Sequence, residues 1–139
     1  MNALVIYQSK GGSTRKMAEE IASELQQNNV QVKVGSIQEI SPEEIESADR
    51  LYMGCQTSNM VLLGKKPDKE WRRYVGKLPI GVRKKTTLFT TYKLATGNMF
   101  KEMRSTLKYR GLQIENNALK SKTGHLTDIH RKIISQSLN

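Results

Sequence analysis

The sequence changes character at Ser9-Lys10-Gly11-Gly12-Ser13-Thr14. A short apolar run over residues 3–7 comes before this stretch, and such a run is typical of a strand that is covered on both faces. An amphipathic pattern over residues 14–28 follows it. Its apolar residues share one face of a helix: Met17, Ala18, Ile21, Ala22 and Leu25. The stretch therefore predicts a turn between a buried strand and the N-terminus of a helix.

A turn of this kind can hold a phosphate group. The first backbone N–H groups of a helix lack partners within the helix and carry partial positive charge, which attracts an anion. Gly11 and Gly12 allow the backbone to approach a ligand closely. The hydroxyls of Ser9, Ser13 and Thr14 add hydrogen-bond donors. The alternative is an ordinary tight turn, in which Ser13 or Thr14 only caps the helix.

Two charged neighbours and two absent patterns refine this prediction. Lys10 or Arg15 would add a full positive charge if its side chain turned toward the phosphate. The sequence has no G-x-x-x-x-G-K-S/T, which argues against a P-loop nucleoside triphosphatase. It also has no G-x-G-x-x-G followed by an acidic residue about 20 positions later, which argues against dinucleotide binding.

Length and composition predict one compact protein. The 139 residues suit a single domain over 1–139. No run of about 18 or more consecutive apolar residues is present, so we expect no membrane span. The apolar run begins directly after Met1-Asn2, which leaves no room for a secretion signal. Cys55 is the single cysteine, and with two histidines it makes a poor set of metal ligands. We therefore expect a cytoplasmic protein without a metal site.

The net charge of +10 is unevenly distributed. Residues 1–64 hold 5 Lys and Arg against 8 Asp and Glu, whereas residues 65–139 hold 18 against 5. A basic region of this kind attracts acidic proteins, nucleic acid or an anionic membrane surface. Aromatic residues do not alternate with the basic ones as they do in single-strand binding proteins, which argues against nucleic acid.

Strand and helix patterns alternate along the chain. Apolar and period-two runs predict five strands: Ala3–Tyr7, Val30–Val34, Leu51–Cys55, Thr86–Thr91 and Leu112–Leu119. Apolar stripes at helical spacing predict five helices: 14–28, 41–48, Lys69–Gly76, Met99–Gly111 and 127–138. This alternation predicts an α/β fold, a three-layer doubly wound sandwich around a parallel sheet.

Polar loops that follow the strands belong at one edge of this sheet. Ligands of open parallel sheets lie beyond the carboxyl ends of the strands, near the point where the strand order reverses. With the strands in the order 2-1-3-4-5, the first and third strands flank that point. The candidate ligand residues after the third and fourth strands are Gln56, Thr57, Ser58, Asn59 and Met60, and Thr91, Tyr92, Lys93 and Gly97. For the loop after the third strand, an ordinary polar connection is the alternative.

Three other conspicuous side chains are assigned no chemistry. Trp71 lies on a predicted helix, which favours a core position or a subunit contact. His125 and His130 lie near the start of the last helix, and no serine, cysteine or acid is placed to form a triad with them. We expect surface or capping positions for both histidines, with Thr127 as the cap of that helix.

The segment Tyr7–Ala22 resembles the N-terminus of flavodoxin-like proteins. In that family a hydroxyl-rich loop of the form S/T-x-S/T-G-x-S/T holds the phosphate of flavin mononucleotide (FMN). Ser9, Gly12 and Thr14 match the pattern, while Gly11 stands where a hydroxyl residue is more usual. The order of predicted strands and helices also matches over the whole chain. The resemblance implies a five-stranded parallel sheet in the order 2-1-3-4-5 and FMN as the cofactor.

The resemblance further implies how the flavin ring is held. Tyr92 follows the fourth strand, where the family often places a tyrosine against the ring. The usual aromatic residue is absent after the third strand, so Met60, Leu62 or Leu63 would cover the other ring face. Carrier flavodoxins are typically acidic around the flavin, whereas this chain is basic in its second half.

Two functions are therefore carried forward. The first is FMN-dependent electron transfer, as a carrier or a small flavin-dependent oxidoreductase, with an acidic protein as redox partner. The alternative is a flavin-free module of the same fold that docks an acidic partner through its basic C-terminal half. A phosphorylation receiver is disfavoured because the first strand ends in Gln8-Ser9 and not in an acidic pair.

Overall fold

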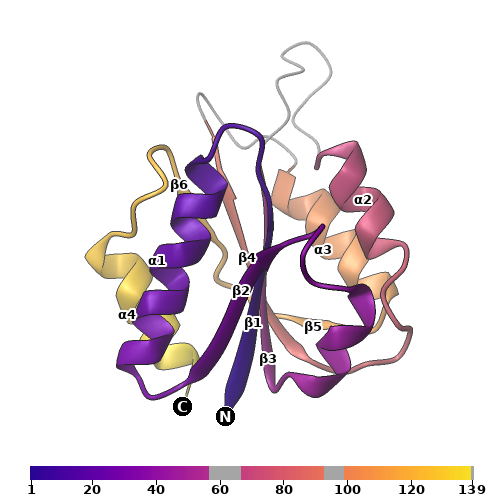
Figure 1. The fold of residues 1–139 in the computed structure, drawn as a ribbon, viewed down its shortest axis with the longest axis horizontal. Coiled ribbons are helices and arrows are strands. Elements are labelled where there is room, and N and C mark those ends of the chain that lie inside the picture. The colour runs from indigo at the N-terminus through magenta and orange to yellow at the C-terminus, as the bar shows by residue number, and fades with distance from the viewer. Residues whose placement is uncertain (57–66, 93–98, 139) are drawn as a thin grey trace.

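The computed structural model describes residues 1–56, 67–92 and 99–138. Its strands form one parallel sheet with helices on both faces (Figure 1). The strand segments are β1 (Asn2–Gln8), β2 (Gln31–Ser36), β3 (Arg50–Gln56), β4 (Lys85–Thr91), β5 (Gln113–Ile114) and β6 (Leu119–Ser121). Their order is β2-β1-β3-β4-β5, and β6 also pairs with β4. This confirms the α/β class and the predicted order 2-1-3-4-5.

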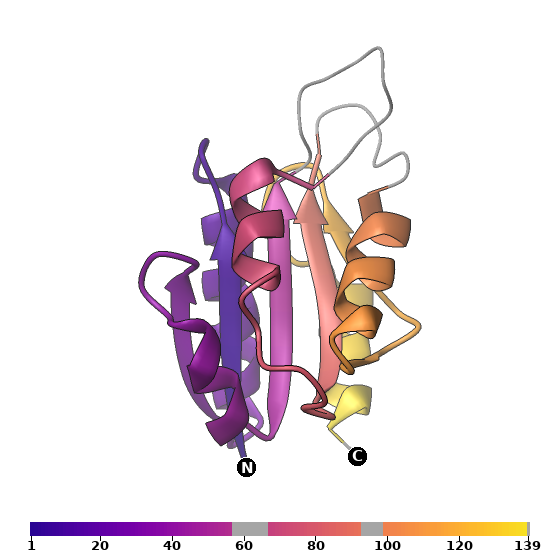
Figure 2. The ribbon, with the colours of Figure 1, turned by 90° about the vertical axis from the view of Figure 1, so that its right-hand side faces the viewer.

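Helices cover both faces of the sheet and complete three layers (Figures 1 and 2). Among the described residues they are α1 (Ser13–Gln27), the 3-10 helix η1 (Pro42–Ser47), α2 (Lys69–Val75), α3 (Met99–Tyr109) and α4 (Asp128–Ser137). α1 and α4 cover one face, and η1, α2 and α3 cover the other. None of these helices is long and apolar enough to cross a membrane.

Alternate residues of β1 enter two separate apolar cores. Leu4 and Ile6 pack in the core beneath α2 and α3, while Val5 and Tyr7 pack in the core beneath α1 and α4. Successive side chains of a strand point to opposite faces of the sheet, so an unbroken apolar run fills both cores. The expectation of a strand covered on both faces is thereby confirmed.

The predicted fifth strand is interrupted. β5 and β6 both pair with β4, through Ile114 opposite Thr86 and Leu119 opposite Phe89. Between them, the Glu115 carboxylate accepts a hydrogen bond of 3.0 Å from the buried Arg50 guanidinium. A charge as deeply buried as that of Arg50 requires a partner. The chain thus leaves the strand ladder where Glu115 pairs with Arg50, a long-range contact that the local pattern could not show.

The helix predicted over 41–48 is shorter and tighter than an α-helix. Ser41 and Glu44 form a capping box at its start, and Pro42 occupies its first position. Ile45 is its buried residue, and Ala48 caps its end, as expected from the sequence. A six-residue segment that buries one apolar side chain has little to extend it, and 3-10 geometry is common in short helices.

The structure agrees with the positions expected for Trp71 and the two histidines. Trp71 is fully buried in the core beneath α2 and α3. Thr127 caps α4, and its hydroxyl accepts a hydrogen bond from the His130 backbone N–H. The His125 ring lies at the surface, 2.8 Å from a Glu20 carboxylate oxygen.

Candidate functional site

The carboxyl ends of β1, β3, β4 and β6 meet at one edge of the sheet (Figure 2). Gln8, Gln56, Thr91 and Ser121 are the last residues of these strands. The turn over 9–12 and the N-terminus of α1 lie at this edge as well (Figure 1). The structure therefore brings together the first loop and the ends of the third and fourth strands, as the sequence predicted.

The first turn is capped by glycine and not by a hydroxyl side chain. Gly12 is the N-cap of α1, with φ at +91°, and no side chain caps the helix. A residue with a Cβ is strained at such a φ, which explains glycine at this position. The Gly12 N–H donates to the Ser9 hydroxyl at 3.1 Å, which closes the turn. The part of the alternative that made Ser13 or Thr14 the cap of the helix is therefore wrong.

The start of α1 presents backbone donors without partners. Lys16 is the first residue of α1 whose N–H bonds back along the helix, to the Gly12 carbonyl at 3.0 Å. Among the described residues, nothing accepts a hydrogen bond from the backbone N–H of Ser13, Thr14 or Arg15. Three N–H groups at a helix start, together with the helix dipole, form a site that suits an anion.

The turn is also open enough for a ligand. A Cβ added at Gly11 or at Gly12 would meet nothing within 4 Å. A phosphate has three oxygens that accept hydrogen bonds, and the three free N–H groups of α1 are donors. The donor set and the open space therefore fit a phosphate monoester.

Thr14 holds the helix start against the sheet. Its side chain is buried, and its hydroxyl lies 2.5 Å from the hydroxyl of Thr91 at the end of β4. Two of the predicted ligand residues are thus hydrogen-bonded to each other across 77 positions of the chain. The pair fixes the distance between the start of α1 and the end of β4.

The two cations expected near the phosphate have other partners. Lys10 pairs with Asp68 at 3.1 Å, and this hydrogen bond raises the pKa of Lys10. The Lys10 backbone N–H donates to the Gln56 side chain at 2.6 Å, which ties the first loop to the end of β3. Arg15 pairs with Glu19 on the surface of α1. Charge at the turn therefore comes from backbone dipoles and not from these side chains.

A buried polar cluster joins the ends of β1, β3 and β4 to Asp68 at the start of α2. The Cys55 thiol accepts a hydrogen bond from the Asp68 N–H at 3.3 Å and lies 3.5 Å from the Gln8 side-chain oxygen. Burial raises the pKa of Cys55 to about 12, so the thiol stays protonated at neutral pH. Thr90 on β4 donates to the Cys55 carbonyl. These contacts position the end of β3 and the start of α2.

The loop between β6 and α4 is a part of the site that sequence reasoning missed. A Cβ at Gly124 would lie 2.5 Å from the Ser13 carbonyl oxygen, so this loop packs directly on the start of α1. The Ser121 hydroxyl accepts from the Gly124 N–H at 3.0 Å, and the Ser121 carbonyl accepts from the Tyr92 N–H at 3.2 Å. The Lys122 ammonium lies 5.8 Å from the centre of the Tyr92 ring. The signal available in the sequence was a small polar run, 121–124, after the last strand.

The remaining predicted ligand residues lie outside the described part of the chain. They are Thr57, Ser58, Asn59 and Met60 after β3, and Lys93 and Gly97 after β4. Leu62 and Leu63, considered for the second ring face, also lie there.

Comparison with known proteins agrees with this geometry. The family model described as flavodoxin matches residues 5–77, more than half of the chain. No curated protein matches the sequence. A flavodoxin structure from the domain Archaea is 23% identical, with a TM-score of 0.74, over 98% of this chain and 92% of that one. Two-electron reduced flavodoxin from Megasphaera elsdenii is 17% identical, with a TM-score of 0.77, over 96% of each chain.

A third structure, oxidised Flavodoxin 1 from Bacillus cereus, is 18% identical over 99% of this chain and 94% of its own, with a TM-score of 0.75. At these identities the solved structures establish the fold, while the family model establishes membership. The matched segment begins within β1 and contains the open turn and the whole of α1. The chain belongs to the flavodoxin family.

Proposed function

We propose that this chain binds FMN at the carboxyl edge of its sheet and carries electrons between other proteins. The observation that carries the proposal is the open Gly11-Gly12 turn beside three N–H groups at the start of α1 that have no acceptor among residues 1–56, 67–92 and 99–138. Membership of the flavodoxin family supports the same assignment. FMN, when bound, supplies one- and two-electron chemistry.

The phosphate of FMN would be held mainly by the backbone. Ser13 and Thr14 offer N–H groups, and the hydroxyls of Ser9 and Ser13 lie in the same short segment. Lys10 is held by Asp68, the N-cap of α2, so its side chain adds positive charge only at longer range. The Thr14–Thr91 hydroxyl pair keeps the turn in register with the end of β4.

The flavin ring would lie between the loops that follow β3 and β4. Tyr92, the residue after β4, is proposed as one ring contact and Gln56, the last residue of β3, as another. Thr57, Ser58, Asn59 and Met60 are proposed to line the opposite side, together with Lys93 and Gly97 after β4. The protein residues bind and orient the ring and limit its access to water.

We also propose that residues 1–139 form a single domain. The two apolar cores lie on opposite faces of one continuous sheet, which supports this organisation. Circular dichroism and Trp71 fluorescence should then report one coincident unfolding transition. Two separate transitions would contradict the single domain.

Titration with FMN and with riboflavin tests the phosphate assignment. We expect the fluorescence of FMN to be quenched on binding. FMN should bind at least about tenfold more tightly than riboflavin, because hydrogen bonds to a charged group contribute about 1.5–3 kcal/mol each. Equal affinity for the two flavins would contradict a phosphate site.

Two variants of Gly11 make the test specific to the turn. Gly11→Asp adds a carboxylate next to the N-cap of α1, at a position where a Cβ has open space, and should weaken the binding of FMN but not of riboflavin. Gly11→Asn is a control of the same shape without the charge. If both variants weaken FMN equally, shape and not electrostatics controls binding at this turn.

A further inference from the structure

The exposed side of α2 and α3 carries an excess of positive charge that has no ion-pair partner in the described part of the chain. The two helices contain six cations and two acids: Lys69, Arg72, Arg73, Lys101, Arg104 and Lys108 against Glu70 and Glu102. We call these six cations the basic face. α2 and α3 lie side by side over the same face of the sheet (Figure 2).

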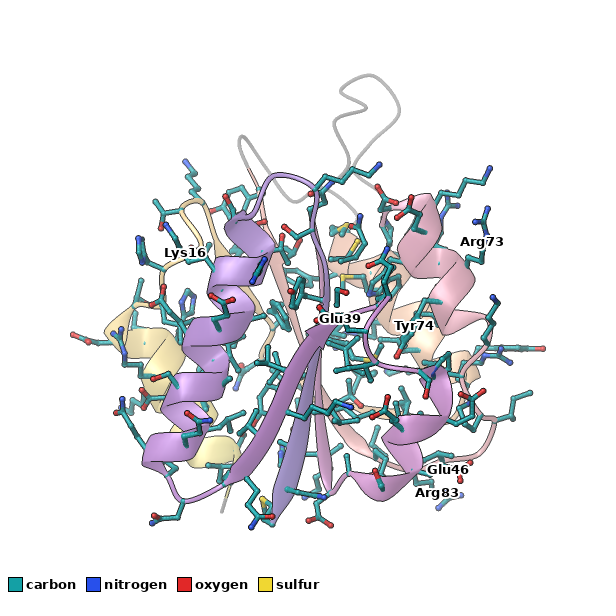
Figure 3. All side chains as sticks on the ribbon, in the orientation of Figure 1. Lys16, Glu39, Glu46, Arg73, Tyr74 and Arg83 are labelled. Carbon is teal, nitrogen blue, oxygen red and sulfur yellow. The ribbon has the colours of Figure 1, made fainter. Side chains whose placement is uncertain are left out.

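Ion pairs within the described residues do not use the basic face. They engage Lys10, Arg15, Lys33, Arg50, His125 and Arg131. Figure 3 shows Arg73 on the outer side of α2 and Arg83 far below that helix, in the segment that leads into β4. Like charges held close together repel one another, so an acidic surface that covers them is favoured.

Two exposed apolar side chains adjoin the lower end of the basic face. Tyr109 is 82% exposed at the end of α3, and Ile80 is 72% exposed in the turn after α2. Their segments touch, since the Gly81 N–H donates to the Arg110 carbonyl at 2.9 Å. An aromatic and an aliphatic side chain beside arginine are typical of the anchors that dominate protein–protein interfaces.

We propose that the basic face, with Tyr109 and Ile80, is a docking surface for an acidic protein. A membrane is disfavoured because Met99, Met103 and Leu107 of α3 are buried in the core. Phe100 packs against that core, so Tyr109 is the one large apolar side chain of α3 that is exposed, which is too little to insert into lipid. The proposal does not rest on flavin binding, because neither α2 nor α3 supplies a proposed FMN ligand.

Binding to a labelled copolymer of glutamate and tyrosine tests the charge requirement. The flavin-free and FMN-loaded proteins should bind it at low salt and release it as salt rises, because exposed charge pairs are screened. Arg73→Glu with Arg104→Glu should weaken binding about tenfold or more. Lys120→Glu with Lys132→Glu makes the same charge change on β6 and α4 and should weaken it no more than about twofold. Equal losses in the two double variants would overturn the proposal.

The apolar anchors have their own control. Tyr109→Ala should reduce the preference for the copolymer over polyglutamate, whereas Ile129→Ala, at a side chain 71% exposed on α4, should not. Amide chemical shifts should change on α2, α3 and residues 78–84, and changes confined to residues 8–14 would overturn the assignment. Tighter binding to phosphatidylglycerol vesicles or duplex DNA, weakened by the same charge reversals, would assign the surface to that ligand and overturn the acidic-protein proposal. The FMN affinity of each variant is measured by titration as well, so that a loss of copolymer binding is distinguished from a loss of FMN binding.

Discussion

The two helical faces of the sheet use their charges in opposite ways. On the side of α1 and α4, Glu20 and Glu24 lie near Arg131, at 3.9 and 3.7 Å, and Arg15 pairs with Glu19. On the side of α2 and α3, no cation of the basic face takes part in an ion pair among the described residues. Internal partners thus close most of the first face, where only Lys16 and Lys132 of the charged residues on α1 and α4 have no ion pair among the described residues. The second face leaves its charge available to another molecule.

The closed face also supports the proposed phosphate site. Glu20 accepts a hydrogen bond from the Leu126 N–H at 3.2 Å and lies 2.8 Å from the His125 ring nitrogen. These contacts hold the β6–α4 loop against α1, where Gly124 packs on the Ser13 carbonyl. Internal pairing on this face therefore orders the turn that would receive the phosphate. Exposed charge on the other face is not required for that order.

The largest effect on stability is expected from Gly54→Ala, within the core of the closed face. A Cβ at this position would lie 2.1 Å from the ring of Phe89, which is fully buried. The ring or the strand must shift, and overpacking of this kind costs about 1–3 kcal/mol. Urea unfolding of the flavin-free protein, followed by circular dichroism, measures the change in the free energy of unfolding.

Gly11→Ala is the matched control for that substitution. Its Cβ would meet nothing within 4 Å, so we expect a change within about 0.5 kcal/mol. A similar loss of stability in the two variants would show that close packing against Phe89 does not make Gly54 more sensitive to substitution than Gly11.

A smaller effect is expected from Glu20→Ala, which removes the acid at the centre of the closed face. The variant loses the contacts with His125, Leu126 and Arg131, and we expect a loss of about 1–2 kcal/mol. Glu70→Ala, on α2, removes an acid without an ion pair in the described structure and should change stability by no more than about 0.5 kcal/mol. If urea unfolding showed equal losses of unfolding free energy in the two variants, the distinction between a closed and an open face would be contradicted.

Much of the fold could be predicted from local pattern. The apolar run of β1 and the stripe of α1 depend on neighbours in sequence, and both appear where the pattern placed them. The break between β5 and β6 could not be predicted, because it accompanies the pairing of Glu115 with Arg50, 65 positions away. A partner of that kind is visible only once the strands are assembled.

The candidate site divides in the same way. Gly12 and the start of α1 follow from spacing along the chain, because a helix start after a buried strand presents free N–H groups wherever it occurs. The pairing of Lys10 with Asp68 and the packing of Gly124 on Ser13 could not be predicted, because each joins segments that are distant in sequence. The sequence thus indicated where a phosphate would bind but not which side chains support the turn.

The smallest expected effect is on the pH dependence of stability, and it involves a histidine on α4, in the closed face. Burial, followed by the charge of Arg131, lowers the pKa of His130 below its usual 6.5, and a hydrogen bond with the Lys120 backbone opposes this only in part. The Thr127 N–H donates to His130 Nδ1 at 3.1 Å, a contact that requires the unprotonated nitrogen. Between the lowered pKa and about 6.5, the unfolded chain binds more protons than the folded one, so stability falls as pH drops through this window.

His130→Gln should therefore lose less stability than the parent protein between about pH 7.5 and 5.5. The carboxylates with lowered pKa values, Glu39 and Glu44, stay ionised over that range, because their titration lies below 4.5 in the folded protein. α2 and α3 contain no histidine, so binding of the acidic copolymer by the basic face should stay constant over the same range. Urea unfolding and copolymer titration at the two pH values measure both quantities. An equal pH dependence of stability in the parent and the variant would contradict the role of His130. If copolymer binding weakened in parallel with stability as the pH fell, the two faces would not be independent.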